Sequence, residues 1–231
     1  MNTWLIFSLM LVGAYLVGSI PSAYLAARWS RGIDIRKVGT HNVGSANVMR
    51  TTSKWVALPV ILFDIGKGAF VVWAARLAGL NVGMQAAVGI AAIIGHNWPV
   101  FLNFQGGRGI ATSLGVILML SPPVGLIALA VAYAPAPFKQ MALGVFIALF
   151  ILPLLSWFFA APFHIEDRGA VTLAYVAIAL IAYVRRLLHH RTALSRDTPA
   201  AELVMNRLLF DRDIRDRQLW LHQEQAERSR A

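Results

Sequence analysis

Seven apolar runs separated by short polar stretches constrain the fold of this 231-residue chain more than any other feature. A run of about 20 apolar residues is long enough to cross the hydrocarbon core of a bilayer as a helix. Hydrophobic residues make up 58% of the chain and charged residues only 14%, whereas soluble domains carry about 25% charged residues. The sequence therefore predicts an all-α, polytopic integral membrane helix bundle. The predicted spans are 3–27, 55–78, 84–102, 110–120, 123–136, 141–160 and 169–187.

The first run is predicted to be a retained span. Its start, residues 1–7, lacks the basic residues that open a cleaved signal peptide. The apolar stretch that follows is long enough for a membrane crossing.

The number of crossings depends on Ser121-Pro122-Pro123, which separates the fourth and fifth runs. A proline inside a helix removes a backbone hydrogen bond and clashes with the preceding turn, so a kink or a break is expected there. A reversal gives about seven helices, whereas one kinked span over 110–136 gives six. Polar residues gather in 28–54, in 103–109 and in 185–231, and most of the basic ones lie in the first and last of these segments. Seven helices place these segments on one face, which the positive-inside rule predicts to be cytoplasmic.

Charge and cysteine content exclude several function classes. The net charge is +10, but the basic residues adjoin apolar runs and no nucleic-acid-binding motif accompanies them. Contact with membrane lipid is therefore predicted, and nucleic-acid binding is not. The chain has no cysteine, so it has neither a thiolate nucleophile nor a cysteine-based metal site. We expect no metal and no cofactor.

A glycine-rich segment, residues 95–112, lies between two of the apolar runs. Irregular backbone at a membrane boundary is tolerated mainly where it lines a polar cavity or reaches water. Within it, Gly106, Gly107, Arg108 and Gly109 precede a helix-like run from Ile110. Backbone N–H groups and a guanidinium in this order are typical of a phosphate or carboxylate site.

A second polar segment, residues 34–50, mixes glycines, amides, hydroxyls and cations. This mixture suits a polyol phosphate, but it is also typical of an ordinary surface turn. The segment is long for a connector and is predicted on the same face as the glycine-rich segment, which favours a binding role.

Four segments together resemble the ordered motifs of the bacterial acyl-phosphate-dependent glycerol-3-phosphate acyltransferases. They are residues 39–47 with Arg50, residues 64–68, residues 95–112, and His190-Arg191 with Arg196 and Glu202. The resemblance implies one membrane-embedded domain over residues 1–202 in the bacterial cytoplasmic (inner) membrane, with its site facing the cytoplasm. It implies transfer of a fatty acyl group from acyl phosphate to the 1-hydroxyl of glycerol 3-phosphate, forming lysophosphatidic acid for phospholipid biosynthesis. Residues 203–231 lie outside it and are predicted to be a basic tail, either an amphipathic interfacial helix or a solvated one.

The motifs differ from the usual family pattern at several positions. Thr40, His41, Ser45 and Ala46 replace the serine, glycine, alanine and threonine of Gly-Ser-Gly-Asn-x-Gly-Ala-Thr-Asn. Arg108 replaces a lysine, Ala193 an asparagine and Ala200 a glycine. A diverged paralogue with another acceptor, a noncatalytic membrane partner and a lipid transporter therefore remain alternatives.

The candidate site combines residues of both polar segments with residues of the basic stretch that begins at 185. No histidine has the His-x-x-x-x-Asp spacing of acyl-CoA-type enzymes, and an acyl phosphate requires no covalent acyl-enzyme. Arg108 and the neighbouring amides are predicted to bind one phosphate, and Arg50, Asn42, Asn47 and Thr40 to position the other substrate. His190 or a substrate phosphate oxygen is the candidate base. Asp64 and Lys67 lie three residues apart on one helical face, and either a structural ion pair or a catalytic role, with Lys67 directed toward the substrate, is predicted for them. The predicted catalytic residues are Arg108, Arg50, His190 and Thr40, and the predicted substrate-binding residues are Asn42, Gly44, Asn47, Lys67, His96, Gly106, Gly107, Gly109, Thr112, Arg191 and Arg196.

Overall fold

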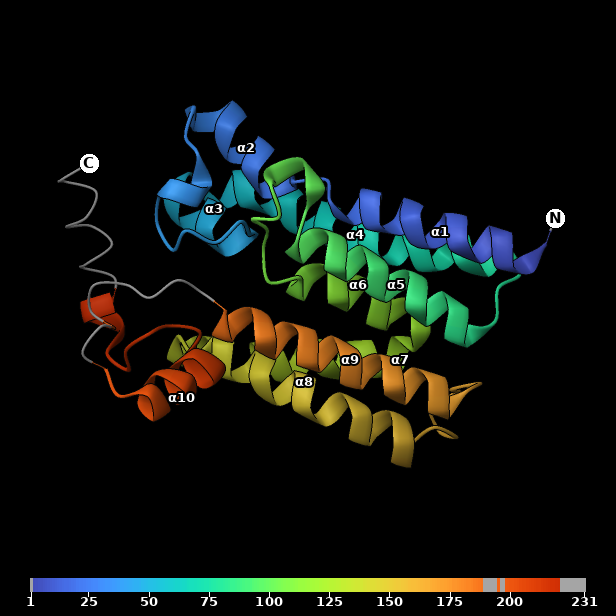
Figure 1. Ribbon diagram of the computed structural model, residues 1–231. Coiled ribbons are helices and arrows are strands. Elements are labelled where there is room, and N and C mark those ends of the chain that lie inside the picture. Colours follow the sequence, from blue (N-terminus) through green and yellow to red (C-terminus); the bar gives the residue numbers. More distant parts are fainter. Residues whose placement is uncertain (1, 189–194, 196–197, 221–231) are drawn as a thin grey trace.

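The computed structural model describes residues 2–188, 195 and 198–220, and within them it contains helices and no strand (Figure 1). This confirms the predicted all-α fold. The α-helices are α1 (Thr3–Gly18), α2 (Ser22–Arg31), α3 (Ser45–Thr51), α4 (Lys54–Leu77), α5 (Val82–Asn97), α6 (Ile110–Leu120), α7 (Pro122–Tyr133), α8 (Met141–Phe158), α9 (Arg168–Leu187) and α10 (Ala200–Phe210). Short 3-10 helices cover Ile35–Lys37, Val100–Leu102 and Ala136–Phe138.

Five of the described helical stretches are long and apolar enough to cross a membrane. Two shorter apolar helices, Ile110–Leu120 and Pro122–Phe138, lie between the third and the fourth. The long helices leave large apolar side chains exposed, among them Leu9, Phe150 and Leu173. Such faces are stable against lipid and unfavourable in water, which fits a multi-pass membrane protein. The five long stretches are Thr3–Arg31, Lys54–Leu77, Val82–Leu102, Met141–Phe158 and Arg168–Leu187.

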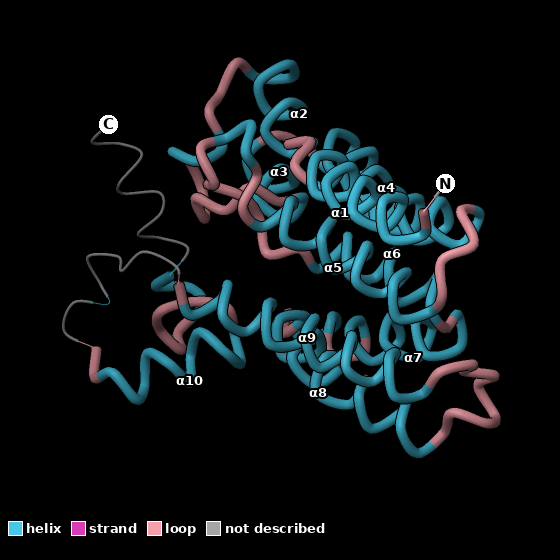
Figure 2. Tube along the Cα trace, turned by 45° about the vertical axis from the view of Figure 1, so that its right-hand side comes forward, coloured by secondary structure: helices cyan, strands magenta, loops and turns pink. Residues whose placement is uncertain are grey.

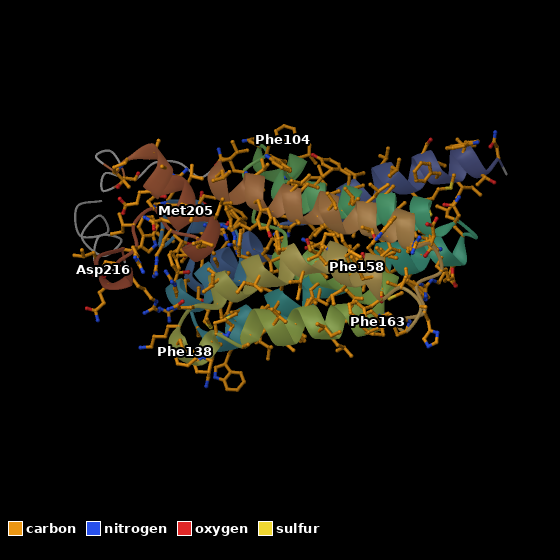
Figure 3. All side chains as sticks on the ribbon, turned by 90° about the horizontal axis from the view of Figure 1, so that it is seen from below. Phe104, Phe138, Phe158, Phe163, Met205 and Asp216 are labelled. Carbon is orange, nitrogen blue, oxygen red and sulfur yellow. The ribbon has the colours of Figure 1, made fainter. Side chains whose placement is uncertain are left out.

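The chain reverses at Ser121, between α6 and α7. Ser121 is extended (φ −154°, ψ 98°), so the two helices are separate. The last turn of α6 lies near the end of α4, since Arg76 donates a hydrogen bond to the carbonyl of Met119 (2.9 Å). From there α7 runs back along α8, and Figure 3 shows Phe138 at the opposite end of the bundle from Phe158 and Phe163. The sequence-based expectation of about seven helices is thus in line with the fold.

The first apolar run differs from the single span predicted over 3–27, because it is interrupted at residues 19–21. Ser19 caps α1 by donating its N–H to the carbonyl of Tyr15 (2.9 Å), and Pro21 precedes α2. The span predicted over 84–102 also differs, because its α-helix, α5, ends at Asn97. Both differences create irregular backbone at the same end of the bundle.

Close helix packing in the core depends on glycine. At Gly18 in α1 a Cβ would collide with the carbonyl of Ala92 in α5, and at Gly95 it would collide with the carbonyl of Tyr15. Small residues let membrane helices approach closely enough for strong van der Waals packing. The resulting contact between α1 and α5 fixes where the α1–α2 break lies relative to the end of α5.

The polar segments of the sequence gather at one end of the bundle. Figures 1 and 2 show α2, α3 and α10 at this end, whereas the amino terminus and the α4–α5 connector lie at the other. The segment 103–109 also lies there, because Arg185 near the end of α9 hydrogen-bonds the carbonyls of Gly106 and Gly107. We call this the loop end. α10 packs against α8 and α9 and spans residue 202, the boundary predicted for the tail.

Candidate functional site

Asn47 holds the polar segment of residues 34–50, the first loop, in shape. Its side chain is fully buried, and its amide nitrogen donates to the carbonyls of Ile35 (3.2 Å), Val38 (2.9 Å) and Asn42 (3.1 Å). Its amide oxygen accepts the backbone N–H of Thr40 (3.0 Å). A buried amide satisfied in this way is a rigid element of structure. Asn47 therefore organises the loop, and its side chain has little left to offer a substrate.

The glycine loop, residues 106–109, packs against both the end of α5 and the first loop. The N–H of Gly107 donates to the carbonyl of His96 (3.2 Å). A Cβ at Gly107 would collide with the His96 ring and the carbonyl of Val43. The glycine loop and the first loop therefore meet at Gly107, although about 60 residues separate them in the chain.

Arg185 supports the same loop from α9. Its guanidinium donates to the carbonyls of Gly107 (3.1 Å) and Gly106 (2.9 Å) and lies 5.1 Å from the centre of the Trp98 ring. Because these carbonyls are bound by Arg185, the glycine loop is held rigidly. The guanidinium also adds positive charge beside Arg108.

A buried polar cluster lies beneath the loop. The ammonium of Lys67 is 2.8 Å from Oδ1 of Asp64, which also accepts the hydroxyl of Ser22 (2.8 Å). The ammonium is also 2.9 Å from Nδ1 of His96 and donates to the carbonyl of Ile20 (3.3 Å). The side chains of Asp64 and Lys67 are each 2% exposed, and charges so deep are costly unless they are paired. The predicted ion pair is thus present, and it connects α4 to α5 and to the α1–α2 break.

A small hollow opens beside this cluster. It encloses about 200 Å³ of empty space, part of it open to solvent. Its lining joins the α1–α2 break to both loops through Gly18, Ser19, Ser22, Val43, His96 and Gly106. Glycines, serines and the His96 ring are among the residues that border it, and its enclosed part has room for about one water molecule.

Arg108 points toward the carboxyl-terminal segment, where its guanidinium forms an ion pair with Asp211. The Nε of Arg108 is buried and has no hydrogen-bond partner among the described residues. Arg108, the residue predicted to bind a phosphate, therefore lies at the loop end, but the carboxylate of Asp211 already contacts its guanidinium.

The other predicted site residues lie in varied settings. Arg50 is exposed in the last turn of α3, and Gly44 is the N-cap residue of that helix. Thr40 and Asn42 are partly buried in the first loop. Gly109 has φ +72° and caps α6, in which Thr112 is buried. His190, Arg191 and Arg196 lie outside the described residues.

The structure adds residues that sequence reasoning did not select for the site. Ser22 and Arg185 contact the cluster and the glycine loop, and Asp211 contacts Arg108. Asn97 is fully buried below Gly109, and neither atom of its amide has a partner among the described residues. The sequence His-Asn-Trp-Pro at residues 96–99 could have pointed to Asn97 as a site residue, whereas no local sequence feature pointed to Asp211.

Charge outside the spans also shapes the first loop. Arg36 hydrogen-bonds Asp34 through Nε (3.0 Å) and Nη2 (2.7 Å), and this bond holds the pKa of Asp34 below its usual value. The same bond raises the pKa of Arg36.

No group of three histidine, cysteine, aspartate or glutamate side chains in the described part of the chain is placed to bind a metal ion.

Relatives and solved structures share this architecture. A solved structure of PlsY (YgiH), described as an integral membrane glycerol 3-phosphate acyltransferase in its glycerol 3-phosphate form, matches with a TM-score of 0.68 and 29% identity. That match covers 81% of this chain and 96% of the other. The form with lysophosphatidic acid matches with a TM-score of 0.71 and 27% identity, covering 94% of this chain and 98% of the other.

Sequence comparison gives the same family. A glycerol-3-phosphate acyltransferase 4 of Dehalococcoides mccartyi (strain CBDB1) is 47% identical over 221 residues, 96% of this chain and 95% of the relative. A glycerol-3-phosphate acyltransferase of Synechococcus sp. (strain CC9902) is 40% identical over 189 residues, 81% of this chain and 90% of the relative. The family model for glycerol-3-phosphate acyltransferases matches residues 8–197. This multi-pass membrane chain therefore belongs to the glycerol-3-phosphate acyltransferase family.

Proposed function

We propose that the chain transfers a fatty acyl group from acyl phosphate to the 1-hydroxyl of glycerol 3-phosphate, forming lysophosphatidic acid. The observation that carries the proposal is the contact of the two glycine-rich loops at Gly107, beside the hollow that His96 lines. Relatives named glycerol-3-phosphate acyltransferases, and a similar structure described as a glycerol 3-phosphate form, support this acceptor.

In this reaction the acceptor oxygen forms a new bond to the acyl carbon, and the bond from that carbon to the phosphate oxygen breaks. Inorganic phosphate leaves, and a substrate phosphate oxygen or His190 takes the hydroxyl proton. Since acyl phosphate is already activated, the protein need only orient the acceptor, bind the phosphates and stabilise the developing oxyanion. We assign phosphate binding to Arg108 and the amides of Gly106 and Gly109, while Gly107, whose N–H bonds the carbonyl of His96, shapes the loop beside them.

The remaining roles follow from position. Arg50, Thr40, Asn42 and Gly44 belong to the first loop and contact the acceptor in this scheme, with Asn47 keeping that loop in shape. Lys67 and Thr112 support the wall below the glycine loop, where Lys67 bonds His96. Arg191 and Arg196, together with His190, complete the set proposed to contact the substrates.

We further propose that the loop end faces the cytoplasm of a bacterial inner membrane. Arg28, Arg31, Arg36, Lys37 and Arg50 lie at this end or border it. The opposite connector at residues 78–81 carries no charge. An excess of Lys and Arg in the short loops of one face is typical of the cytoplasmic side.

Supplying the purified, detergent-solubilised chain with acyl phosphate and glycerol 3-phosphate tests the proposal. We expect lysophosphatidic acid as the product, with no product from acyl-CoA. Other polyol phosphates in the same assay test the acceptor, because Thr40, His41 and Arg108 differ from the usual family pattern. Absence of product from every donor and acceptor would overturn the proposal in favour of a noncatalytic or transport role.

A further inference from the structure

The carboxyl-terminal segment reaches the glycine loop from outside the region that the family model matches. That region ends at residue 197, whereas α10 and the turn after it cover residues 200–213. Figure 3 shows Met205 and Asp216 at the loop end of the bundle. The Dehalococcoides relative aligns over 96% of this chain, so that alignment includes the segment. The segment is thus a feature of some family members in addition to the matched core.

Hydrogen bonds fasten this segment to the membrane helices. Arg186 donates to the carbonyl of Leu208 and to that of Ala142 at the start of α8 (3.1 Å). Arg207 donates to the carbonyl of Leu187 (2.7 Å) at the end of α9 and pairs with Asp213 (2.8 Å). Charge-assisted bonds of this kind fix the position of the turn after α10.

Asp211 has a left-handed backbone conformation, which is uncommon for aspartate. It ends α10 with φ 58° and ψ 39°, the left-handed conformation in which glycine and asparagine predominate. Its side chain reaches Arg108 and forms the ion pair described above. The side chains of Arg108 and Asp211 are 17% and 18% exposed, so the pair is largely shielded from water.

The hydrogen bonding of this pair is incomplete. Nε of Arg108, Nε of Arg186 and Oδ1 of Asp211 are buried and have no partner among the described residues. The charge of Arg108 also interacts with those of Arg185 and Arg186, and Asp211 interacts with Arg186. The guanidinium groups of Arg108 and Arg186 thus face the carboxylate of Asp211, and that of Arg185 lies near Arg108, which leaves excess positive charge and unused donors for a more highly charged anion.

We propose that Asp211 is an internal competitor for the phosphate that Arg108 binds, and that it thereby sets the affinity of the glycine loop for phosphate-bearing substrates. This inference rests on the proposed function, in which Arg108 binds a phosphate. A phosphate carries more charge and more acceptor oxygens than a carboxylate, so it can displace Asp211 from the guanidinium. The displaced side chain turns toward solvent while Arg186 and Arg207 keep α10 in place.

Asp211→Asn tests the proposal, because asparagine has nearly the same size, tolerates the left-handed conformation and lacks the charge. Asp216→Asn is the matched control, since Asp216 is exposed in the same segment and its side chain accepts hydrogen bonds from the N–H groups of Gln218 and Leu219. The measurement is the dissociation constant of inorganic phosphate for the full-length chain in detergent, by isothermal titration calorimetry. We expect Asp211→Asn to bind phosphate at least about threefold more tightly, and Asp216→Asn to bind it as the wild type does.

Phosphate affinity that is unchanged or weaker in Asp211→Asn would overturn the proposal, because Asp211 would then orient Arg108 instead of competing for it. If this variant does not fold, Asp211→Gly replaces it, since glycine is the residue most favoured at this backbone position. Phosphate binding needs no acyl transfer, so a wild-type chain without acyltransferase activity still gives a result. Active enzyme with unaltered phosphate affinity in Asp211→Asn would contradict this inference alone.

Discussion

Nδ1 of His96 lies 2.9 Å from Nζ of Lys67 and 3.6 Å from Oδ1 of Asp64. An ammonium group only donates hydrogen bonds, so the shorter contact, with Lys67, favours Nδ1 as the acceptor and the proton of the neutral ring on Nε2. The other two donors of Lys67 serve Asp64 and the carbonyl of Ile20. Nε2 lies beside Gly107 at the hollow. We therefore predict that His96 presents an N–H donor to the hollow, as an oxyanion-stabilising group does, and does not act as a base.

Replacing His96 by glutamine or asparagine distinguishes these roles. The side-chain amide of glutamine places an N–H donor near the position of Nε2, whereas the shorter asparagine places it near Nδ1. We expect His96→Asn to lower kcat by about 100-fold or more, the usual cost of an oxyanion donor, and His96→Gln to retain much more activity. Initial rates with acyl phosphate and glycerol 3-phosphate give the comparison. Equal losses in the two variants would indicate that His96 acts as a base.

Lys67→Met tests the buried ion pair. Methionine has a similar shape but leaves the carboxylate of Asp64, 2% exposed, without its cation. We expect the free energy of unfolding to fall by about 3–5 kcal/mol, because an uncompensated charge is left inside the protein. The double variant Asp64→Asn/Lys67→Met removes both charges and should recover part of this loss. Unfolding in mixed detergent micelles measures both, and a double variant no more stable than the single one would argue against the pairing.

Local patterns predicted most of the fold and only part of the site. Runs of apolar residues gave the spans, and Ser121-Pro122-Pro123 with the distribution of basic residues gave the reversal between α6 and α7. The spacing of Asp64 and Lys67 predicted their pair. The break at residues 19–21 was not predicted, because the hydrophobicity continues through it although Pro21 is a local signal.

Contacts between distant segments were beyond sequence reasoning. Ser22 meets Asp64 because the chain bends at residues 19–21 and α2 then packs against α4. Asn47 had been expected to contact substrate, yet four hydrogen bonds to its own loop engage it. Asp211 is about 100 residues from Arg108 in the chain, and no periodicity connects the two positions.

Gly107→Ala should disrupt the junction of the two loops. The added Cβ would overlap the His96 ring and the carbonyl of Val43, so the glycine loop must shift. Shifts of about 1 Å at a reacting centre cost about 100-fold in rate, and we expect a loss of kcat of that order. Gly66→Ala is the matched control, because nothing lies within 4 Å of its added Cβ. A Gly107→Ala variant with wild-type turnover would show that the junction does not position the reacting groups.

Asp34→Asn should reveal a pH-dependent contribution to stability at the first loop. The hydrogen bond from Arg36 places the folded-state pKa of Asp34 below its ordinary value of 3.8. The carboxylate therefore stabilises the fold above that value, and the contribution is lost as the pH falls through the folded-state pKa. Because the pair is partly exposed, we expect a difference of less than about 1 kcal/mol at pH 7, and a smaller one near pH 3. Thermal unfolding of both proteins in detergent at the two pH values measures it. A difference that grows on acidification would mean that the carboxylate is not stabilised by Arg36 in the folded state.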